Sequence, residues 1–429
     1  MKVAVLGGGI TGLTAAYCLV KKSHQVSVFE KSAVLGGLAV GFKQPNWNWH
    51  LEYAYHHLFA NDYDIINFAK EIGFEKIFFK APESASLFND LKIHPMDTPI
   101  DFLKLPYLDI FNKLRAGSIL AFLKLSPFFD FYEKQTSESF IKKTMGKTVW
   151  VRLWQDLFRK KFGDYAENIL ASFIWARINK RTKNLGYIEG GFQTLIDYLF
   201  NELTSLRVNI KTDYEIKEIN KRGEEFLING QLFDKVVSTL PTPIMVKLTK
   251  NIFSEKYLKR FSKLKYLHAL TLILETKEPL LKKTYWLNVS APQIPIMAIV
   301  QHTNFINKKN YGDNHITYLG WYLEKENEKL KMKNEKLLEY VWPYLGKINP
   351  NFNFPFSKLF TSHQSLITNS FTFFGPFAQP IFDKDFGKNK PDFITPEKNF
   401  FIANLDMTYP YDRGTNYAVK LGRQVAEMI

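Results

Sequence analysis

The stretch Lys2-Val3-Ala4-Val5-Leu6-Gly7-Gly8-Gly9-Ile10-Thr11-Gly12 decides the fold of this chain. Its first five residues form an apolar run that is typical of a buried parallel strand. A helical pattern follows over residues 13–22, and residues 25–29 alternate as a second strand. A strand, a glycine-rich turn, a helix and another strand in this order predict the start of a dinucleotide-binding α/β domain.

Three glycines of the turn satisfy the pattern G-x-G-x-x-G, and each has a physical role. Gly7 allows the tight turn, Gly9 lets the backbone approach a pyrophosphate, and Gly12 lets the helix pack on the strand. The N-terminus of the following helix has free N–H groups and a dipole that favour an anion, and Ile10 and Thr11 lie in the turn just before it. All five residues are therefore candidates for binding the diphosphate of a dinucleotide.

A carboxylate stands where the second strand ends. Glu30 can accept hydrogen bonds from the hydroxyls of an adenosine ribose. The same charge would repel a 2′-phosphate, so the pattern disfavours NADP.

The run from Glu30 to Gly37 resembles the extended fingerprint of flavoproteins with two dinucleotide-binding motifs. These include protoporphyrinogen oxidase, phytoene desaturase, the flavin amine oxidases and, more distantly, UDP-galactopyranose mutase. The resemblance implies FAD as the cofactor, with Gly36 and Gly37 close to its diphosphate and ribityl chain. It also implies contacts from Lys31 and from Leu38, which stands where many members have an arginine.

The end of the chain resembles the second FAD motif of the same superfamily. Residues 400–405 have the pattern of a buried strand, a glycine turn follows, and the last residues are helical. A helix N-terminus aimed at the pyrimidine edge of the flavin would stabilise the anionic reduced ring. The resemblance implies cofactor contacts here from Asp406, Arg413, Gly414 and Asn416. It also implies that a strand over residues 214–219 offers the backbone of Ile216 to the adenine edge.

Composition limits the class of protein and its partners. The 429 residues exceed what one core usually organises, and 46% are apolar, which excludes general disorder. The net charge is +15, from 57 basic against 42 acidic residues, but the lysines are scattered among acids and no nucleic-acid-binding motif is present. We expect a small-molecule substrate that is flat or apolar, no nucleic acid, and at most a weak peripheral contact with an anionic membrane.

The first twenty residues and the single cysteine bear on localisation. Residues 3–20 carry no charge, but their four glycines and two threonines favour a strand, turn and helix over a signal peptide or membrane span. Cys18 allows no intrachain disulfide, which agrees with a reducing compartment. We therefore expect a cytoplasmic protein, or one peripheral to the inner face of the membrane.

Three histidines are the candidate catalytic residues. His56 and His57 follow the glycine doublet, in the segment that related flavoproteins lay beside the isoalloxazine ring, and local packing is the alternative. His302 lies in a polar run, 301–304, that either faces the flavin or simply caps a strand. His57 is the preferred candidate. Adjacent histidines without a third ligand at a suitable spacing do not indicate a metal site.

The middle of the chain has two segments that are open to two interpretations. Residues 116–123 are apolar and flanked by basic residues; a core helix of a cap domain is favoured over a membrane-dipping helix. Residues 137–181 are helical in pattern, rich in tryptophan and basic residues, and similar to a protoporphyrinogen-oxidase-like subgroup. They either hold an acidic or flat substrate or form surface charge over a packed tryptophan core.

The fold class that follows is α/β, with a discontinuous parallel sheet, an α+β substrate domain and a helical cap. The FAD-binding domain is expected from residues 1–80, 186–245 and 395–429, the cap from 81–185, and the substrate domain from 246–394. Strands over 264–275, 296–301 and 316–322 and a helix over 323–342 are expected in the substrate domain. The reacting centre should lie between the domains.

Together these features predict an FAD-dependent oxidoreductase that removes hydride from a substrate C–C or C–N bond. The alternative is a non-redox flavin isomerase similar to UDP-galactopyranose mutase, which needs arginines for a substrate diphosphate. Arg152, Arg177 and Arg181 are the candidates for that role. A third alternative is a protein that FAD stabilises without catalysis.

Overall fold

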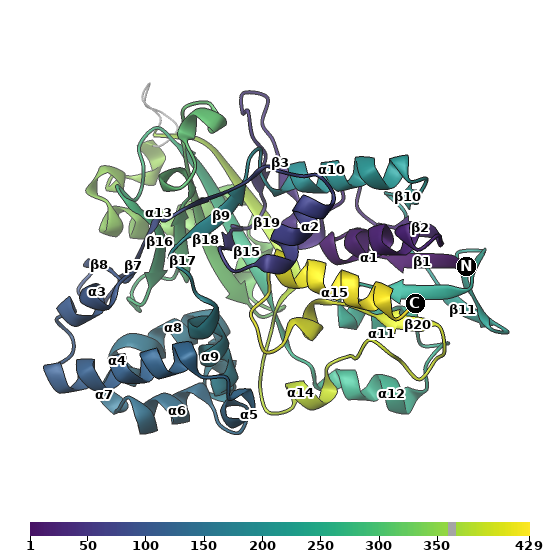
Figure 1. Cartoon of the computed structure of the whole chain (residues 1–429). Coiled ribbons are helices and arrows are strands. Elements are labelled where there is room, and N and C mark those ends of the chain that lie inside the picture. Colours follow the sequence, from purple (N-terminus) through teal and green to yellow (C-terminus); the bar gives the residue numbers. More distant parts are fainter. Residues whose placement is uncertain (359–365) are drawn as a thin grey trace.

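A parallel sheet carries the glycine-rich turn, and its five strands come from three distant parts of the chain (Figure 1). The computed structural model describes residues 1–358 and 366–429; residues 359–365, within the range expected for the substrate domain, lie outside the described part. The strand order is β10-β2-β1-β14-β20, and each neighbouring pair is parallel. The bounds are β1 Lys2–Leu6, β2 Gln25–Phe29, β10 Asn209–Lys211, β14 Lys235–Ser238 and β20 Phe400–Ile402. The predicted discontinuous sheet is confirmed.

The first and last long helices of the chain lie side by side against this sheet (Figure 1). They are α1 (Ile10–Lys21) and α15 (Thr415–Glu427). A side chain at Gly422 would lie 2.6 Å from the Thr11 carbonyl oxygen, so only glycine permits this approach. Lys22 Nζ donates to the Ala426 carbonyl at 2.7 Å. The helices α2 (Tyr63–Glu71) and α10 (Phe192–Ser205) pack beside the same pair.

A second sheet of seven strands forms the other half of the molecule, in the order β19-β15-β18-β17-β16-β7-β8. The bounds are β7 Glu83–Leu87, β8 Ile93–Pro95, β15 Tyr266–Thr276, β16 Thr284–Val289, β17 Ala298–Gln301, β18 His315–Leu323 and β19 Ile367–Pro380. The strands predicted over 264–275, 296–301 and 316–322 are confirmed. β7 and β8 come from the range expected for the cap, yet β7 pairs with β16 in this sheet.

The helix predicted over residues 323–342 begins and ends later than expected. A short 3-10 turn at Glu328–Lys331 comes first, started by the Asn327 side chain, which accepts from the Lys329 N–H. Met332 is extended, and α13 runs over Asn334–Ile348. Its apolar face packs in the core of the second sheet with the side chains of Leu337, Leu338, Val341, Trp342 and Leu345. Local capping therefore decided the boundary against the longer periodic pattern.

A helical lobe packs beside the second sheet and contains α3 to α9 (Figure 1). The bounds are α3 Pro99–Lys104, α4 Ile110–Leu125, α5 Phe129–Tyr132, α6 Ser137–Thr144, α7 Lys147–Val149, α8 Gln155–Phe162 and α9 Ala171–Lys180. This confirms the helical character of residues 137–181. The core placement expected for residues 116–123 is correct only in part, because the buried residues of α4 are Ala116 and Leu123.

The remaining elements are short. They are β3 Gly41–Phe42, β4 Leu51–Glu52, β5 Leu58–Phe59, β6 Ile77–Lys80, β9 Leu185–Ile188, β11 Ile219–Arg222, β12 Glu225–Ile228, β13 Gln231–Phe233, α11 Thr242–Leu248, α12 Glu255–Lys259 and α14 Phe386–Asn389. No helix in the described ranges is long and apolar enough to cross a bilayer.

Candidate functional site

The glycine-rich turn leaves open space at one of its three glycines. Gly7 has φ +106°, and a Cβ there would lie 2.6 Å from Thr239 Oγ1. A Cβ on Gly12 would lie 2.0 Å from the Gly7 carbonyl oxygen, so both glycines shape the turn itself. A Cβ on Gly9 would meet only Gly37 Cα, at 3.8 Å. Gly9 is therefore not needed for packing, which fits a backbone surface kept open for a ligand.

The glycine doublet lies against this turn. The Gly36 N–H donates to the Gly8 carbonyl at 2.9 Å, and Gly36 and Gly37 both have positive φ. The N-terminus of α1, at Gly9, has no side-chain cap and no acidic residue in its first turn. Uncapped N–H groups beside an open glycine backbone make a suitable site for an anion. The structure thus brings together the predicted residues at 7, 9–12, 36 and 37.

The side chain of the neighbouring residue Leu38 lies close to the second sheet. A Cβ built on Gly375 would lie 3.6 Å from Leu38 Cδ2, so the leucine reaches β19 of the second sheet. Leu38 therefore offers an apolar side chain between the two sheets.

The Glu30 carboxylate holds the glycine turn. It accepts from the Gly8 N–H and from the Ser32 N–H, each at 2.8 Å. A carboxylate has about four acceptor positions, so two remain for a ligand hydroxyl. Lys31 pairs with Glu215 at 2.7 Å, and both side chains are exposed. The predicted ribose acceptor is thus also a structural part of the turn.

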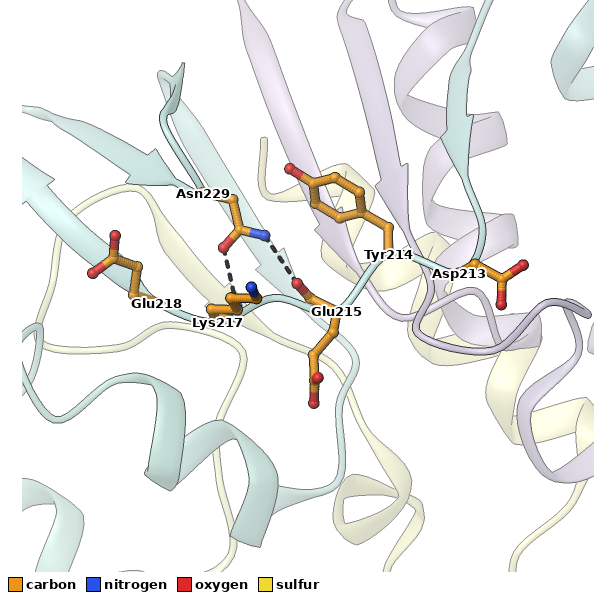
Figure 2. A pocket seen from close by; sticks show the side chains of 6 residues that line it. All are labelled: Asp213, Tyr214, Glu215, Lys217, Glu218 and Asn229. Carbon is orange, nitrogen blue, oxygen red and sulfur yellow. Dashed lines mark hydrogen bonds between the residues drawn. The ribbon is translucent and has the colours of Figure 1, made fainter.

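Figure 2 shows a surface hollow of about 470 Å³ beside the loop that follows β10. It is lined by Asp213, Tyr214, Glu215, Lys217, Glu218 and Asn229. The Tyr214 N–H donates to the Glu30 carbonyl at 2.9 Å, which ties this loop to the end of β2.

The strand predicted over residues 214–219 is replaced by a loop over 214–218, and only Ile219 belongs to a strand, β11. The Asn229 side chain accepts from the Lys217 N–H at 3.0 Å and donates to the Glu215 carbonyl at 2.9 Å, as Figure 2 shows. A side-chain amide thus replaces the strand ladder on both sides of Ile216. Ile216 therefore lies on a loop, two residues after the Tyr214 N–H that bonds to the Glu30 carbonyl.

The C-terminal motif supplies a second open helix end. Gly414 precedes α15, which has neither a side-chain cap nor an acidic residue in its first turn. Asn416 is committed elsewhere: its amide donates to Asp64 Oδ2 at 3.0 Å and accepts from the Ile65 N–H at 3.1 Å. A cofactor contact at Asn416 would therefore come from its backbone.

Asp406 is a buried carboxylate with one oxygen unpaired. Oδ2 accepts from Thr242 Oγ1 at 2.5 Å and from the Tyr266 hydroxyl at 2.7 Å. Oδ1 has no hydrogen-bond partner among the described residues. Burial raises the pKa of Asp406 to about 6. Because an unpaired buried acceptor is costly, this oxygen fits a donor supplied by a ligand.

A cationic cluster lies between the helical lobe and the C-terminal motif, formed by Lys161, Arg177, Asp412 and Arg413. Asp412 pairs with Lys161 at 2.9 Å and with Arg177 at 3.5 Å. Although burial opposes it, these two cations lower the pKa of Asp412, whereas burial lowers the pKa of Lys161 to about 8. Two cations thus pair with one carboxylate, and the third cation, Arg413, follows it in the chain.

Arg413 has no ion pair among the described residues. Its Nη1 donates to Gln379 Oε1 at 3.0 Å, and its guanidinium lies 4.7 Å from the centroid of the Tyr322 ring. Burial lowers the pKa of Arg413 to about 10. The cluster therefore keeps an excess of positive charge in a partly desolvated place, which favours an anionic ligand.

His56 and His57 lie within electrostatic reach of this cluster, and their lowered pKa values leave both neutral near pH 7. Their Nδ1 atoms bond to the Ala54 carbonyl at 2.7 Å and to the Tyr285 hydroxyl at 3.2 Å, respectively. Burial, followed by nearby charges such as Arg413 and Arg177, lowers the pKa of His56 to about 4 and that of His57 to about 3. Both side chains stay partly accessible. The predicted pair is thus brought next to the cationic cluster.

His302 lies in the core instead. It is 2% exposed, and its Nε2 bonds to the Tyr311 hydroxyl at 2.8 Å. The rings of Tyr187 and Tyr318 pack against it. Residues 302–304 form a short 3-10 turn directly after β17, which favours the strand-capping interpretation of residues 301–304 over a polar patch that faces a ligand.

Lys161 and Asp412 are site residues that sequence reasoning missed. Lys161 lies in the basic segment 137–181 and Asp412 precedes Arg413, but no spacing in the sequence showed that the two would pair. In the described ranges, no group of three histidine, cysteine, aspartate or glutamate side chains could hold a metal ion.

Comparison with known proteins agrees with this geometry. The family described as flavin containing amine oxidoreductase matches residues 10–429. A zeta-carotene desaturase from Solanum lycopersicum is 27% identical over 139 residues, which are 30% of this chain and 23% of that protein. The chain thus matches less than a quarter of that relative's length.

Two solved structures have the same fold over nearly the whole chain. An Exiguobacterium sp. 255-15 protein assigned as a protoporphyrinogen oxidase has a TM-score of 0.74 at 16% identity, covering 100% of this chain and 98% of that one. Reduced UDP-galactopyranose mutase has a TM-score of 0.75 at 16% identity, covering 99% and 94%. Such low identities show the fold alone. The match over residues 10–429 is what identifies the chain, which belongs to the flavin-containing amine oxidoreductases, FAD-dependent enzymes that act on small molecules.

Proposed function

We propose that this enzyme removes hydride from a C–C or C–N bond of a small molecule that has an apolar or flat body and carries a negative charge. The observation that carries the proposal is the excess positive charge of the cationic cluster beside two neutral histidines. A cationic amine would be repelled there, whereas a carboxylate or phosphate group would be attracted.

The residues present fit FAD in three ways. The open backbone at Gly9 and the doublet at Gly36 offer N–H groups to the diphosphate. Glu30 and the loop at Ile216 are proposed to hold the adenosine. The uncapped start of α15 and the unpaired Asp406 oxygen are proposed to face the flavin end and a ribityl hydroxyl.

The chemistry divides between cofactor and side chains. FAD, when bound, supplies the acceptor for the electron pair of the broken C–H bond. Lys161, Arg177 and Arg413 bind and orient the anionic group of the substrate. His57 is neutral above about pH 4, so it acts as a hydrogen-bonding partner rather than a proton store. Lys161, with a pKa of about 8, is the cluster residue that can exchange a proton near neutral pH.

The rival function is a non-redox isomerase acting on a diphosphate substrate, and one observation favours it. Arg177 and Arg181 both act on His57 electrostatically, so both guanidinium groups lie near the proposed site. Arg152, the third candidate arginine, is exposed on the π-helical turn Trp150–Trp154.

Anaerobic titration of the FAD-loaded enzyme with anionic candidate substrates separates the two functions. A hydride donor bleaches the oxidised flavin, whereas an isomerase substrate is converted only after prior reduction and leaves the flavin reduced. The Arg177→Gln variant tests the role of the cluster. It should keep its FAD but need a higher substrate concentration for the same bleaching. Faster bleaching by cationic amines than by anionic compounds would overturn the proposed substrate class.

A further inference from the structure

The helical lobe exposes an unusual amount of apolar surface. Ten of the large hydrophobic residues that are exposed in the described chain fall between residues 93 and 131: Ile93, Ile100, Leu103, Ile110, Phe111, Leu114, Phe122, Leu125, Phe128 and Phe131. Scattered single residues of this kind need no explanation, but a contiguous group marks an interaction surface.

The helix α4 presents the centre of this surface as a stripe. Phe111, Leu114, Phe122 and Leu125 recur at helical spacing and point to solvent, and Phe111 and Leu125 are 81% and 82% exposed. The opposite side packs inward at Ala116 and Leu123. A helix of a globular protein normally shows the reverse, with its apolar stripe buried.

The neighbouring helices extend the stripe. Ile100 and Leu103 of α3 are exposed on one side. On the other side, an open hollow of about 670 Å³ is lined by Phe122, Pro127, Phe128, Phe129, Asp130, Phe131, Tyr132 and Lys134. We define the apolar face of the lobe as the exposed hydrophobic residues of α3, α4 and α5 together with Phe128. They are Ile100, Leu103, Ile110, Phe111, Leu114, Phe122, Leu125, Phe128 and Phe131.

Cations flank the apolar face without carboxylate partners. α4 carries Lys113, Arg115 and Lys124 and no acidic residue. Arg115 donates to the Lys143 and Thr144 carbonyls, and Lys124 donates to the Asn179 and Arg181 carbonyls. Among the ion pairs of the described residues, none involves these three cations, so their charge is not neutralised within the chain.

We propose that this apolar face docks the enzyme onto the surface of an anionic lipid bilayer. The apolar stripe can insert among the acyl chains of a lipid leaflet, and the cations beside it can pair with the anionic head groups. A second copy of the chain fits less well, because facing α4 helices would bring their three cations together and α4 itself has no acidic residue to pair them. The described helices are too short or too polar to span, so the contact is peripheral.

Flotation of the FAD-loaded protein with vesicles tests the proposal. Vesicles of phosphatidylcholine mixed with phosphatidylglycerol should bind it about tenfold more strongly at low salt than pure phosphatidylcholine vesicles. The Phe111→Ser/Leu125→Ser double variant should lose about tenfold of this binding. Because both side chains are largely exposed, its thermal unfolding should not change. Ile394→Ser, at an exposed residue outside the face, is the matched control and should bind like the wild type.

Two further measurements make the result decisive. Lys113→Gln should weaken binding to the anionic vesicles and leave binding to neutral vesicles unchanged. Light scattering reports self-association: a dimer that the double variant dissociates would assign the face to a second copy and overturn the proposal. Equal binding to neutral and anionic vesicles, or unchanged binding of the double variant, would overturn it as well. None of these outcomes depends on the substrate, so failure here leaves the proposed chemistry standing.

Discussion

The two halves of the candidate site recognise their ligands by different means. At the glycine turn, the groups offered are backbone N–H groups around Gly9 and Gly36, and side chains are excluded. In the cationic cluster, the groups offered are the side chains of Lys161, Arg177 and Arg413, from two helices and a loop.

This difference decides what each half demands of the sequence. A backbone cradle needs glycine at fixed local spacings, since any side chain would fill it. A side-chain cluster needs only the correct tertiary placement, so its residues can be far apart in the chain. The cradle is therefore strict in residue type, whereas the cluster depends on total charge.

The largest expected effect is at the cradle. Gly9→Val should fold normally, since a Cβ there meets no close atom, yet FAD should bind at least about 100-fold more weakly, or about 3 kcal/mol, because the side chain takes its place. Calorimetric titration of the apoprotein with FAD measures this. Gly117→Ala, at another glycine with open space, is the control and should bind FAD normally. If Gly9→Val bound FAD as the wild type does, the backbone at Gly9 would not form part of the FAD site.

Glu30 tests whether a side chain contributes to the cradle. Glu30→Ala removes acceptors for the Gly8 and Ser32 N–H groups and for the proposed ribose, so FAD affinity should fall by roughly 1.5–3 kcal/mol. The same titration applies. Glu30→Gln retains one acceptor oxygen and should lose less. If both variants bound FAD as the wild type does, the carboxylate would have no part in recognition.

His302 tests the assignment of a histidine to the core. Because its pKa falls from 6.5 to about 3 on folding, the unfolded chain binds more protons between these values. Stability should thus be lost as the pH falls through this window, by about 2 kcal/mol per such histidine between pH 7 and 5.

Comparing the wild type with His302→Phe isolates the part of the pH dependence of stability that His302 causes. The raised pKa of Glu52, about 7, acts in the opposite direction, since its contribution is lost as the pH rises towards 7. Denaturant unfolding of the wild type and of His302→Phe at pH 7 and 5 measures how much more unfolding free energy the wild type loses between these pH values. An identical pH dependence would show that His302 titrates normally.

The smallest effect is expected at the cluster. Lys161 loses its charge as the pH rises through about 8, so affinity for inorganic phosphate, followed by the flavin spectrum, should fall by up to about tenfold between pH 7 and 9. Lys161→Met should bind phosphate weakly at both values. A pH dependence that survives in Lys161→Met would assign the titration to another group.

Features that depend on local sequence spacing could be predicted, whereas features that depend on tertiary placement could not. The parallel sheet and the first helix could be predicted because strand, turn and helix signals lie within thirty residues, although the helix starts at Ile10 and not at residue 13. The loop at Ile216 could not, because it depends on the amide of Asn229 from a later segment. The cluster around Asp412 was missed since its members lie about 250 residues apart and share no spacing.

The apolar pattern of residues 116–123 shows a further limit. Periodicity predicts a helix with an apolar side, but not whether protein covers that side. In α4 the stripe of Phe111 and Leu125 is left uncovered. His302 shows the converse, since its polarity suggested a functional surface while Tyr311 satisfies it in the core.

The contact between α1 and α15 has a consequence for how the enzyme is made. Gly422 must meet Thr11, and β20 completes the sheet that β1 began, so the sheet closes only when residues 400–422 have been made. Until then the nascent chain has a glycine turn but no second helix end at Gly414. Stable cofactor loading should therefore follow the synthesis of this segment, and a ribosome-bound chain that stops before Gly414 should carry no flavin.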